Sequence, residues 1–337
     1  MVQQEKPSAT TLCDVVIATR NRPEPLRSTL VSIGQQTTLP STVIIVDSSD
    51  TQDTQEVVEL LASMLPYFIR YQKSSIASAA IQRNFGVAMS DAPLICLLDD
   101  DVDLDPSFLQ EIVPILADDR DERIGGISGT IVNQTYSHPR LLNRCLLRLC
   151  TWDFRANWAG KVVGPAVNFL PADVPNTLTD VEWLPTTCTV YRRSIIAKQR
   201  FCEEFVGYSF AEDLHLSTRI AKSHRLLNCS RARVYHHDLG GATHKDWKAL
   251  GKSMVTNRHK IMSEVLERRS VKYHVRLFLY EVVYGSLAWL AGGVGGSRLK
   301  RLFALQSGKL AGFWQILGSR WGRDVQGETV KKRLEVR

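Results

Sequence analysis

The sequence lacks the features that mark several large classes of protein. It has no C-x-x-C pair, no internal repeat and no low-complexity tract. The first twenty residues contain Lys6 and only a short apolar stretch at residues 15–18, too short for a secretory signal, so we expect the chain to begin in the cytosol. The cysteines are scattered and several lie in apolar runs. We therefore expect reduced, mostly buried thiols at Cys13, Cys96, Cys145, Cys150, Cys188, Cys202 and Cys229.

The composition is that of a folded protein. With 337 residues, of which 44% are hydrophobic, the chain has room for one large domain or two medium ones and is not disordered as a whole. The net charge of +7 suits nucleic acid, an anionic membrane surface or a phosphate-rich substrate, because lysine and arginine attract all three. Charge alone does not choose among them.

The first part of the chain alternates short apolar runs with segments of helical period. A buried strand is predicted at residues 15–17 and further strands at residues 43–46, 68–71 and 93–98, and the segments between them have apolar residues at helical spacing. This pattern is typical of an α/β protein with a largely parallel, Rossmann-like sheet flanked by helices. In such sheets ligands gather at the carboxyl ends of the strands.

The rest of the chain is less regular. We expect an irregular insertion at residues 133–165, a strand at residues 181–191, a helix at residues 193–198 and a further helix from about Asp213. We therefore predict one domain over residues 1–265 and a helical region over residues 266–337, for which association with a membrane is one interpretation.

The segment from Leu277 to Val294 is almost wholly apolar, with basic residues on both sides. It is barely long enough to span a bilayer and contains Glu281 and several glycines, which argue against a transmembrane helix. An interfacial helix, favoured by the basic flanks, and a buried helical hairpin are the other interpretations.

An acidic cluster follows the strand at residues 93–98. Five carboxylates fall within seven residues, and they repel one another unless they are solvated or bind a cation. Magnesium and manganese suit such hard oxygen ligands. A calcium loop counted from Asp99 fails, because Leu104 stands where glycine is required and Gln110 where a glutamate is required. We predict a Mn²⁺ or Mg²⁺ site that includes Asp99 and Asp101.

Polar residues also follow the first two strands. Thr19 and Arg20 come after the first strand and Asp47 comes after the second, where its carboxylate could accept hydrogen bonds from a ribose or a base. Arg83 lies on the helix before the acidic strand, within reach of a phosphate. The alternative is structural: Asp47 as a turn cap and Arg83 as a surface charge. The first turn lacks G-x-G-x-x-G, so a dehydrogenase-type dinucleotide site has little support.

Two later motifs carry acid–base or metal-binding groups. Glu212 and Asp213 open a helix, where a carboxylate is commonly a cap, but Asp213 is also a candidate general base. His236 and His237 end an apolar run and either could supply a metal nitrogen.

Taken together, these residues resemble the family 2 glycosyltransferases of the GT-A fold. The resemblance spans residues 14–260 and rests on A-T-R-N-R at residues 18–22, Asp47, R-N-F-G at residues 83–86 and L-D-D-D at residues 98–101. It implies that the nucleotide-sugar is held by Ala18, Thr19, Arg20, Asp47, Arg83, Asp99 and Asp100. It also implies that Asp99 and Asp101 organise the metal-diphosphate and that Glu212-Asp213 is the E-D motif, with Asp213 as base. In some relatives a histidine ligand stands where His236 and His237 lie.

The resemblance implies an inverting, non-processive transfer from a UDP-, dTDP- or GDP-sugar to a saccharide or lipid-linked saccharide acceptor. Ala18 and Arg20 depart from the usual proline and aromatic residue, and Thr186-Thr187-Cys188 replaces a glycine-rich acceptor segment. A Q-x-x-R-W motif of processive members is absent, since Gln315 and Arg320-Trp321 have the wrong spacing. We expect a cytoplasmic location, peripheral to the membrane, with an anionic membrane surface as a further partner.

Two other classes of protein compete with this interpretation. A nucleotidyltransferase would carry a glycine-rich basic loop after the first strand, but residues 19–22 contain no glycine. A non-catalytic protein that binds nucleic acid or lipid headgroups would account for the positive charge but not for the acidic cluster. We therefore expect no nucleic-acid partner.

Overall fold

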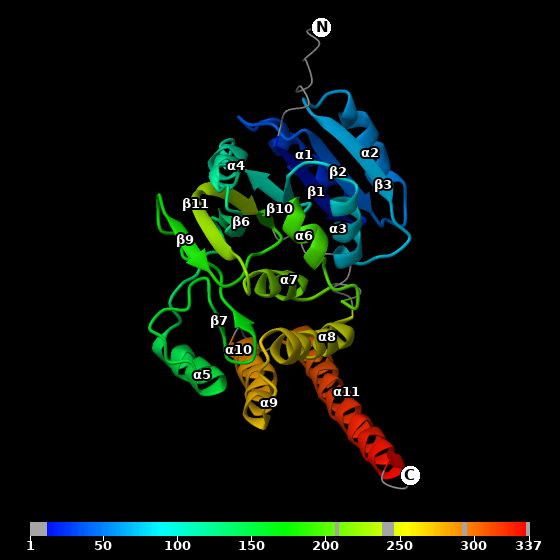
Figure 1. Ribbon diagram of the computed structural model, residues 1–337, viewed down its shortest axis with the longest axis vertical. Coiled ribbons are helices and arrows are strands. Elements are labelled where there is room, and N and C mark those ends of the chain that lie inside the picture. The colour runs from blue at the N-terminus through cyan, green and yellow to red at the C-terminus, as the bar shows by residue number, and fades with distance from the viewer. Residues whose placement is uncertain (1–11, 206–208, 238–245, 292–294, 335–337) are drawn as a thin grey trace. The chain divides into compact units, whose positions relative to one another are not determined.

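The computed structural model of the protein describes residues 12–205, 209–237, 246–291 and 295–334 (Figure 1). The expectation about the N-terminal segment concerns mostly residues 1–11, which lie outside this range. The chain divides into two compact units. The first contains Met1–Arg140, Phe154–Val163 and Val167–Thr243, and the second contains Leu141–Asp153, Gly164–Ala166 and His244–Arg337. The predicted domain boundary at residue 265 remains a prediction.

The first unit is built on a mixed sheet. In the described residues this sheet has nine strands in the order β3-β2-β1-β4-β10-β6-β11-β5, with β9 paired to β11. Strands β1, β2, β3 and β4 are parallel, and so are β6 and β11, whereas β10 runs antiparallel to both β4 and β6. The strands are β1 (Cys13–Thr19), β2 (Thr42–Asp47), β3 (Phe68–Lys73), β4 (Leu94–Leu98), β5 (Val102–Leu104), β6 (Ile124–Ile131), β9 (Leu178–Val181), β10 (Cys188–Arg192) and β11 (Arg225–His236). A separate hairpin pairs β7 (Val162–Val163) with β8 (Val167–Asn168).

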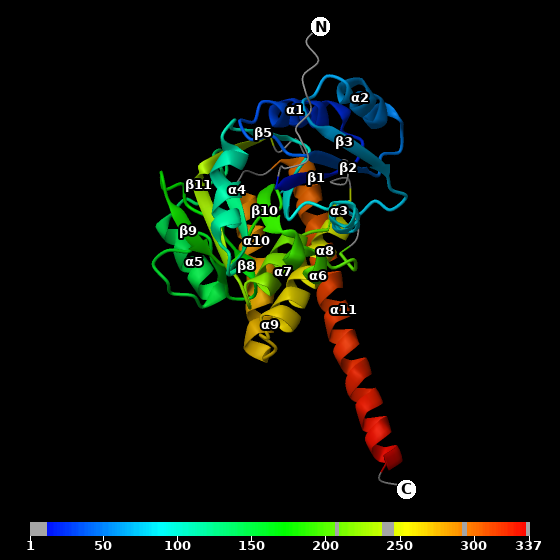
Figure 2. The same ribbon diagram turned by 45° about the horizontal axis from the view of Figure 1, so that its top comes forward.

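Helices cover both faces of the sheet (Figure 2). The apolar faces of α1, α2 and α4 pack with Ile17, Ile45 and alternate strand residues on one side. On the other side α3, α6 and α7 pack against Val16, Ile44 and their neighbours. Because successive residues of a strand point to opposite faces, the buried central residues of β1 and β2 are apolar on both faces. The helices are α1 (Pro23–Gly34), α2 (Asp53–Ala62), α3 (Ala79–Ala88), α4 (Phe108–Asp118), α6 (Arg193–Gln199) and α7 (Glu212–Ile220).

The glycine of the R-N-F-G motif has a packing reason. A Cβ atom at Gly86 would collide with the side chain of Val16, and it would also lie 3.4 Å from the side chain of Val46. Helix α3 therefore needs glycine to approach β1 and β2 closely, and this approach carries Arg83 toward the carboxyl ends of those strands.

The regular elements of the second unit are helices in the described residues. Its elements are α5 (Leu141–Thr151), α8 (Trp247–Lys260), the π-helix η2 (Ile261–Val265), α9 (Val271–Phe278), the π-helix η3 (Leu279–Tyr284), α10 (Gly285–Ala291) and α11 (Gly296–Leu334). Within it, Glu281 is buried and forms ion pairs with Arg258 at 2.8 Å and Lys309 at 2.9 Å. No helix in the described part of the chain has both the length and the hydrophobicity that crossing a bilayer demands. The end of the predicted apolar segment, residues 292–294, lies outside the described residues.

The early strand predictions were confirmed, and two later predictions were wrong. The segment 181–191 is not one strand, because β9 ends at Val181 and β10 begins only at Cys188. Pro185 lies between them, and the two strands join different neighbours, β11 and β4. The insertion at residues 133–165 is not irregular throughout, because α5 forms there and buries Leu147 and Cys150.

Candidate functional site

Three parallel strands bring polar residues to one edge of the sheet. Thr19 ends β1 opposite Asp47 at the end of β2, and Ile17 of β1 lies opposite Leu98, the last residue of β4. Asp99 follows Leu98 directly. The residues predicted from separate strand ends therefore share one edge, as parallel pairing requires.

The acidic turn after β4 is held by cations and hydroxyl groups. Asp99 accepts hydrogen bonds from Arg83 at 2.9 Å and from Thr187 at 2.8 Å. The buried Asp100 accepts one from Thr19 at 2.6 Å and pairs with Arg22 at 2.9 Å. Cations and hydroxyl groups thus lie beside each carboxylate, which limits the repulsion among them.

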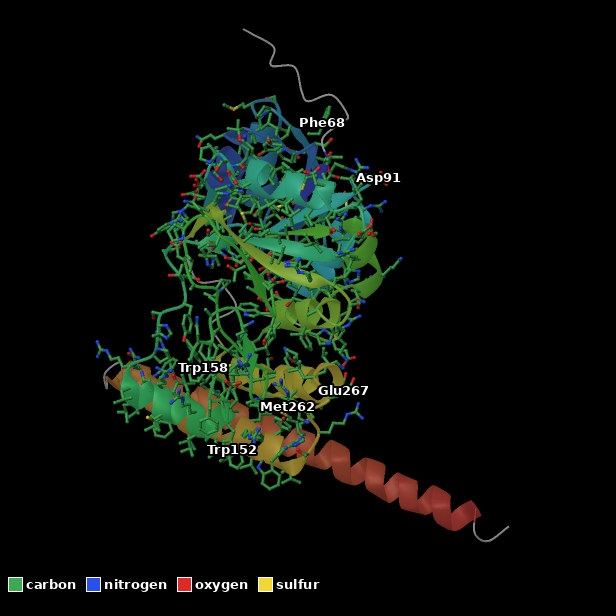
Figure 3. All side chains as sticks on the ribbon, turned by 60° about the vertical axis from the view of Figure 1, so that its left-hand side comes forward. Phe68, Asp91, Trp152, Trp158, Met262 and Glu267 are labelled. Atoms are coloured by element: carbon green, nitrogen blue, oxygen red, sulfur yellow. The ribbon has the colours of Figure 1, made fainter. Side chains whose placement is uncertain are left out.

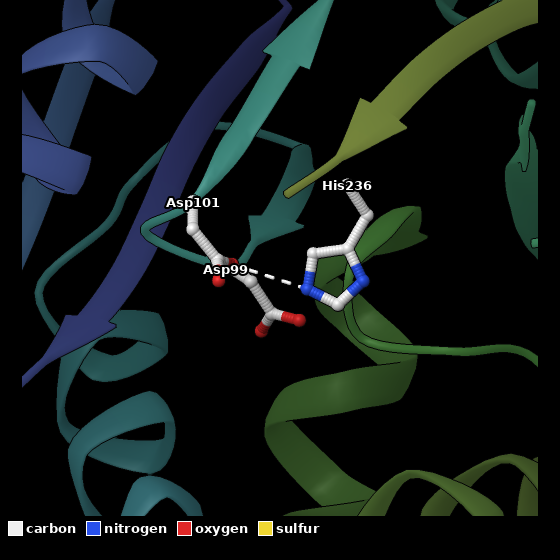
Figure 4. A group of neighbouring side chains, drawn as sticks. All are labelled: Asp99, Asp101 and His236. Carbon is white, nitrogen blue, oxygen red and sulfur yellow. Dashed lines mark ion pairs between the residues drawn. The ribbon is translucent and has the colours of Figure 1, made fainter. Parts of the chain in front are cut away.

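Asp101 pairs with two groups. It binds Arg22 at 2.5 Å and the Nε2 atom of His236 at 3.1 Å (Figure 4). Burial alone would raise the pKa of the Asp101 carboxyl, but the hydrogen bonds from His236 and Arg22 hold that pKa well below its usual range. Burial dominates at Asp100 and raises the pKa of its carboxyl to about 7, against the opposing charge of Arg22. Of the two neighbours, Asp101 is therefore the one held as a carboxylate.

Asp99, Asp101 and His236 form the candidate metal site. One ligand atom of each lies within 4.8 Å of the others. The two carboxylates are ligands that suit Mn²⁺ or Mg²⁺, and the imidazole of His236 adds a nitrogen donor to the set. His237 points elsewhere, since its Nε2 atom lies 2.7 Å from Asp103. Of the two predicted histidines, the structure brings His236 to the acidic turn.

Glu212 and Asp213 begin helix α7 in the same region. Arg83 forms an ion pair of 2.5 Å with Glu212 while its other terminal nitrogen binds Asp99, so one guanidinium joins α7 to the acidic turn. Ala211 immediately before the helix has φ = 63°, in the left-handed region that costs energy for a residue with a Cβ. The strained turn at Ala211 thus fixes the point at which helix α7 begins, and with it the position of Glu212 and Asp213.

Asp213 is partly exposed, whereas Glu212 is buried. The backbone N–H of Leu214 donates to the Asp213 carboxylate at 2.6 Å. Burial by its surroundings raises the pKa of the Asp213 carboxyl, and the charge of Asp99 acts in the same direction. A raised pKa makes a carboxylate a better proton acceptor, as a general base requires.

The other predicted nucleotide-binding residues lie around the ends of β1 and β2. Asp47 has no exposed surface, and each of its carboxylate oxygens already accepts two hydrogen bonds, from Ser49 on one side and from Tyr71 and Lys73 on the other. Arg20 pairs with Asp50 at 3.3 Å, and Ala18 is a strand residue opposite Val46. The side-chain oxygens of Asp47 are therefore not open to a ligand in this arrangement.

Sequence reasoning missed several members of the site. Arg22 contacts both Asp100 and Asp101, and Thr187 contacts Asp99, although each stands in a segment that the sequence analysis quoted. Arg22 could have been predicted from its position in the turn after the first strand, because residues beyond the carboxyl ends of parallel strands gather at the site. Lys73 and Tyr71 follow the same rule, since both lie near the carboxyl end of β3.

The mixed sheet, the acidic turn after β4 and the carboxylate pair opening α7 define a GT-A-type glycosyltransferase. A sequence model of the family "Glycosyl transferase family 2" matches residues 14–198, which is more than half of the chain. The chain belongs to the glycosyl transferase family 2.

Curated relatives match only part of this chain. A validoxylamine A glucosyltransferase from Streptomyces hygroscopicus subsp. limoneus is 33% identical over 104 residues, which are 30% of this chain and 23% of the relative. A hyaluronan synthase from Pasteurella multocida is 30% identical over 136 residues, covering 40% of this chain and 14% of that enzyme. In both cases the match covers a minor part of the relative's length.

A solved structure resembles the chain over most of its length. It is the mannosyltransferase PcManGT from Pyrobaculum calidifontis in complex with GDP-Man and Mn²⁺. The two structures have a TM-score of 0.55 with 14% sequence identity, over 92% of this chain and 89% of that one. This likeness supports the fold.

Proposed function

We propose that the protein transfers a single sugar from a nucleotide-diphosphate sugar to a hydroxyl group of a saccharide or lipid-linked saccharide, with inversion at the anomeric carbon. The observation that carries the proposal is the double ion pair of Arg83. It connects Asp99, in the turn that would hold the donor diphosphate, with Glu212, the neighbour of the would-be base. We therefore infer that the sugar donor and the general base Asp213 belong to one site.

In this mechanism Asp213 accepts the proton of the acceptor hydroxyl as that oxygen bonds to the anomeric carbon. The bond from that carbon to the diphosphate oxygen breaks in the same displacement, and the nucleoside diphosphate leaves with the electron pair. The partial exposure of Asp213 supports its access to an acceptor, and the buried pairing of Glu212 with Arg83 supports a positioning role for Glu212.

Asp99, Asp101 and His236 are the residues that would hold the Mn²⁺ or Mg²⁺ ion. Such an ion stabilises the charge that develops on the leaving diphosphate. The cationic partners that Asp101 already has, Arg22 and His236, support this assignment, because they favour the carboxylate form that a metal ligand requires. Arg22 would then release or share Asp101 with the ion while keeping its contact with Asp100.

The test is calorimetric titration of the protein with UDP, GDP and dTDP, with and without Mn²⁺. GDP and Mn²⁺ are included because the Pyrobaculum relative was solved with GDP-Man and Mn²⁺. We expect one nucleotide to bind only with Mn²⁺, and we expect Asp101→Ala and His236→Ala to lose most of this binding. His237→Ala is the matched control and should bind as the wild type does.

Three results would count against the proposal. If His237→Ala lost nucleotide binding and His236→Ala kept it, the histidine ligand of the metal would be His237 and not His236. Full metal-dependent binding by Asp101→Ala would overturn the metal site. If no nucleotide bound and the protein instead bound DNA in a salt-dependent way, the non-catalytic alternative would replace the enzyme.

A further inference from the structure

The second unit exposes large apolar side chains on two neighbouring helices. On α5, Leu142 and Leu149 are 72% and 61% exposed, and Trp152 just beyond the helix is 59% exposed. Their spacing of seven and three residues places them along one side of the helix. On α9, Val271 and Val275 are 72% and 51% exposed at a spacing of four. Both helices therefore direct apolar residues away from their own unit.

Contacts link the two helices that carry these residues. Helix α5 packs against η3 and α9. The guanidinium group of Arg276 on α9 lies 4.5 Å from the ring centre of Trp152 and 4.8 Å from that of Tyr273. Figure 3 shows Trp152 at the outer margin of this unit. We call the surface formed by the exposed residues of α5 and α9 the apolar face.

The two helices of the apolar face carry charge of one sign, while Asp153 follows Trp152 directly and the exposed Glu267 precedes α9. Residues 141–152 contain no acidic residue and include Arg144 and Arg148. From residue 268 to residue 323 the single acidic residue is Glu281. That carboxylate is 1% exposed and paired with Arg258 and Lys309, so it offers no negative charge to a partner. The helices of the apolar face thus contain basic residues, among them the exposed Lys272, and no exposed carboxylate.

We propose that the apolar face binds the surface of an anionic lipid bilayer, with the leucine, valine and tryptophan side chains at the acyl boundary and the basic side chains at the headgroups. An exposed apolar strip with basic flanks is the combination that interfacial helices use. Anionic headgroups attract each nearby lysine or arginine, and the attraction weakens with salt. The inference goes beyond the proposed transfer reaction and does not depend on the donor site.

Co-sedimentation with lipid vesicles tests the inference on the full chain. The probes are vesicles of phosphatidylcholine and vesicles of phosphatidylcholine mixed with phosphatidylglycerol. We expect binding to the mixed vesicles that falls as salt rises. Leu149→Ser should weaken it by roughly tenfold, because a leucine leaves the acyl boundary. Lys272→Gln should weaken it by about fivefold at low salt, because one charge is removed.

Met64→Ser is the matched control, because Met64 is 67% exposed but lies in the first unit. It should bind vesicles as the wild type does. Metal-dependent nucleotide binding is measured on the same samples and should be unchanged in every variant, which separates this inference from the proposed function.

Two outcomes would overturn the inference. The first is an absence of binding to either kind of vesicle. The second is sedimentation-velocity evidence that the wild type self-associates and Leu149→Ser does not, with no vesicle binding, since the apolar face would then join two copies of the chain.

Discussion

Arg83 is the residue whose replacement most directly tests how the site is built. It is 6% exposed, and its two terminal nitrogens reach different carboxylates, Asp99 at 2.9 Å and Glu212 at 2.5 Å. Replacement by lysine keeps the positive charge but removes the planar fork that lets one side chain bridge two acids. We predict that Arg83→Lys holds only one of the two carboxylates.

The expected magnitude follows from the lost contact. A hydrogen bond to a charged group contributes about 1.5–3 kcal/mol. If the transition state depends on that contact, kcat/KM should fall by roughly 10- to 150-fold. The assay is release of the nucleoside diphosphate from the sugar donor whose nucleotide binds in the titration, in the presence of Mn²⁺. Thermal unfolding of the same samples checks that the variant is folded.

Arg225 provides the matched control. It also uses two nitrogens to bind a carboxylate, that of Asp180, with both distances 2.9 Å, but its side chain is 57% exposed and that of Asp180 is 63% exposed. Exposed ion pairs contribute little, so Arg225→Lys should keep kcat/KM within about twofold of the wild type. A folded Arg83→Lys protein with wild-type kcat/KM would refute the bridging role, and an equal loss in both variants would show a nonspecific effect.

Two further predictions concern carboxylates whose pKa the fold shifts. As a general base Asp213 must be ionised, and burial raises its pKa, so kcat/KM should fall on acidification at a pH above the ordinary aspartate value of about 3.9; Asp213→Asn should lower it by about 100- to 10,000-fold. If kcat/KM fell on acidification only at the ordinary aspartate value, or if Asp213→Asn kept wild-type kcat/KM, Asp213 would not be the general base. Glu281→Gln should destabilise the second unit by about 3–5 kcal/mol, because Arg258 and Lys309 would remain buried without their carboxylate. Burial raises the pKa of Glu281 but the two cations outweigh it and lower that pKa, so the stabilisation is present at neutral pH and is lost as pH falls through the lowered value. Melting temperatures of wild type and variant should therefore converge in acid, and a constant difference would contradict this.

The parts of the fold that could be predicted are those fixed by local pattern. The strands β1, β2 and β4 are apolar runs bounded by polar turns, whereas β3 has a mixed sequence, and each of the four was predicted within a few residues of its observed ends. The segment at residues 181–191 was mispredicted because its apolar residues are shared between two strands with different neighbours. A window of sequence reports how apolar a segment is but not which strand it pairs with.

The same distinction divides the site. A rule that places ligands at strand ends was enough to select Asp99, Asp47 and Thr19, because it needs only the position of each strand. It could not select the contact between Arg22 and Asp101, which are 79 residues apart in the chain, or that between Arg83 and Glu212, which are 129 apart. Such pairs form only once the sheet order is set, and no local pattern encodes that order.

Asp47 shows why the position of a residue does not by itself assign its role. The residue stands where the family resemblance places a nucleotide contact, yet Ser49, Tyr71 and Lys73 occupy its carboxylate oxygens. The Lys73 side chain is 44% exposed while that of Asp47 is fully buried, so a ligand approaching this strand end meets the ammonium group first. Direct contact of a base with Asp47 would require Lys73 or Tyr71 to give up its hydrogen bond. The carboxylate is therefore better placed to hold these two side chains than to read the nucleotide itself.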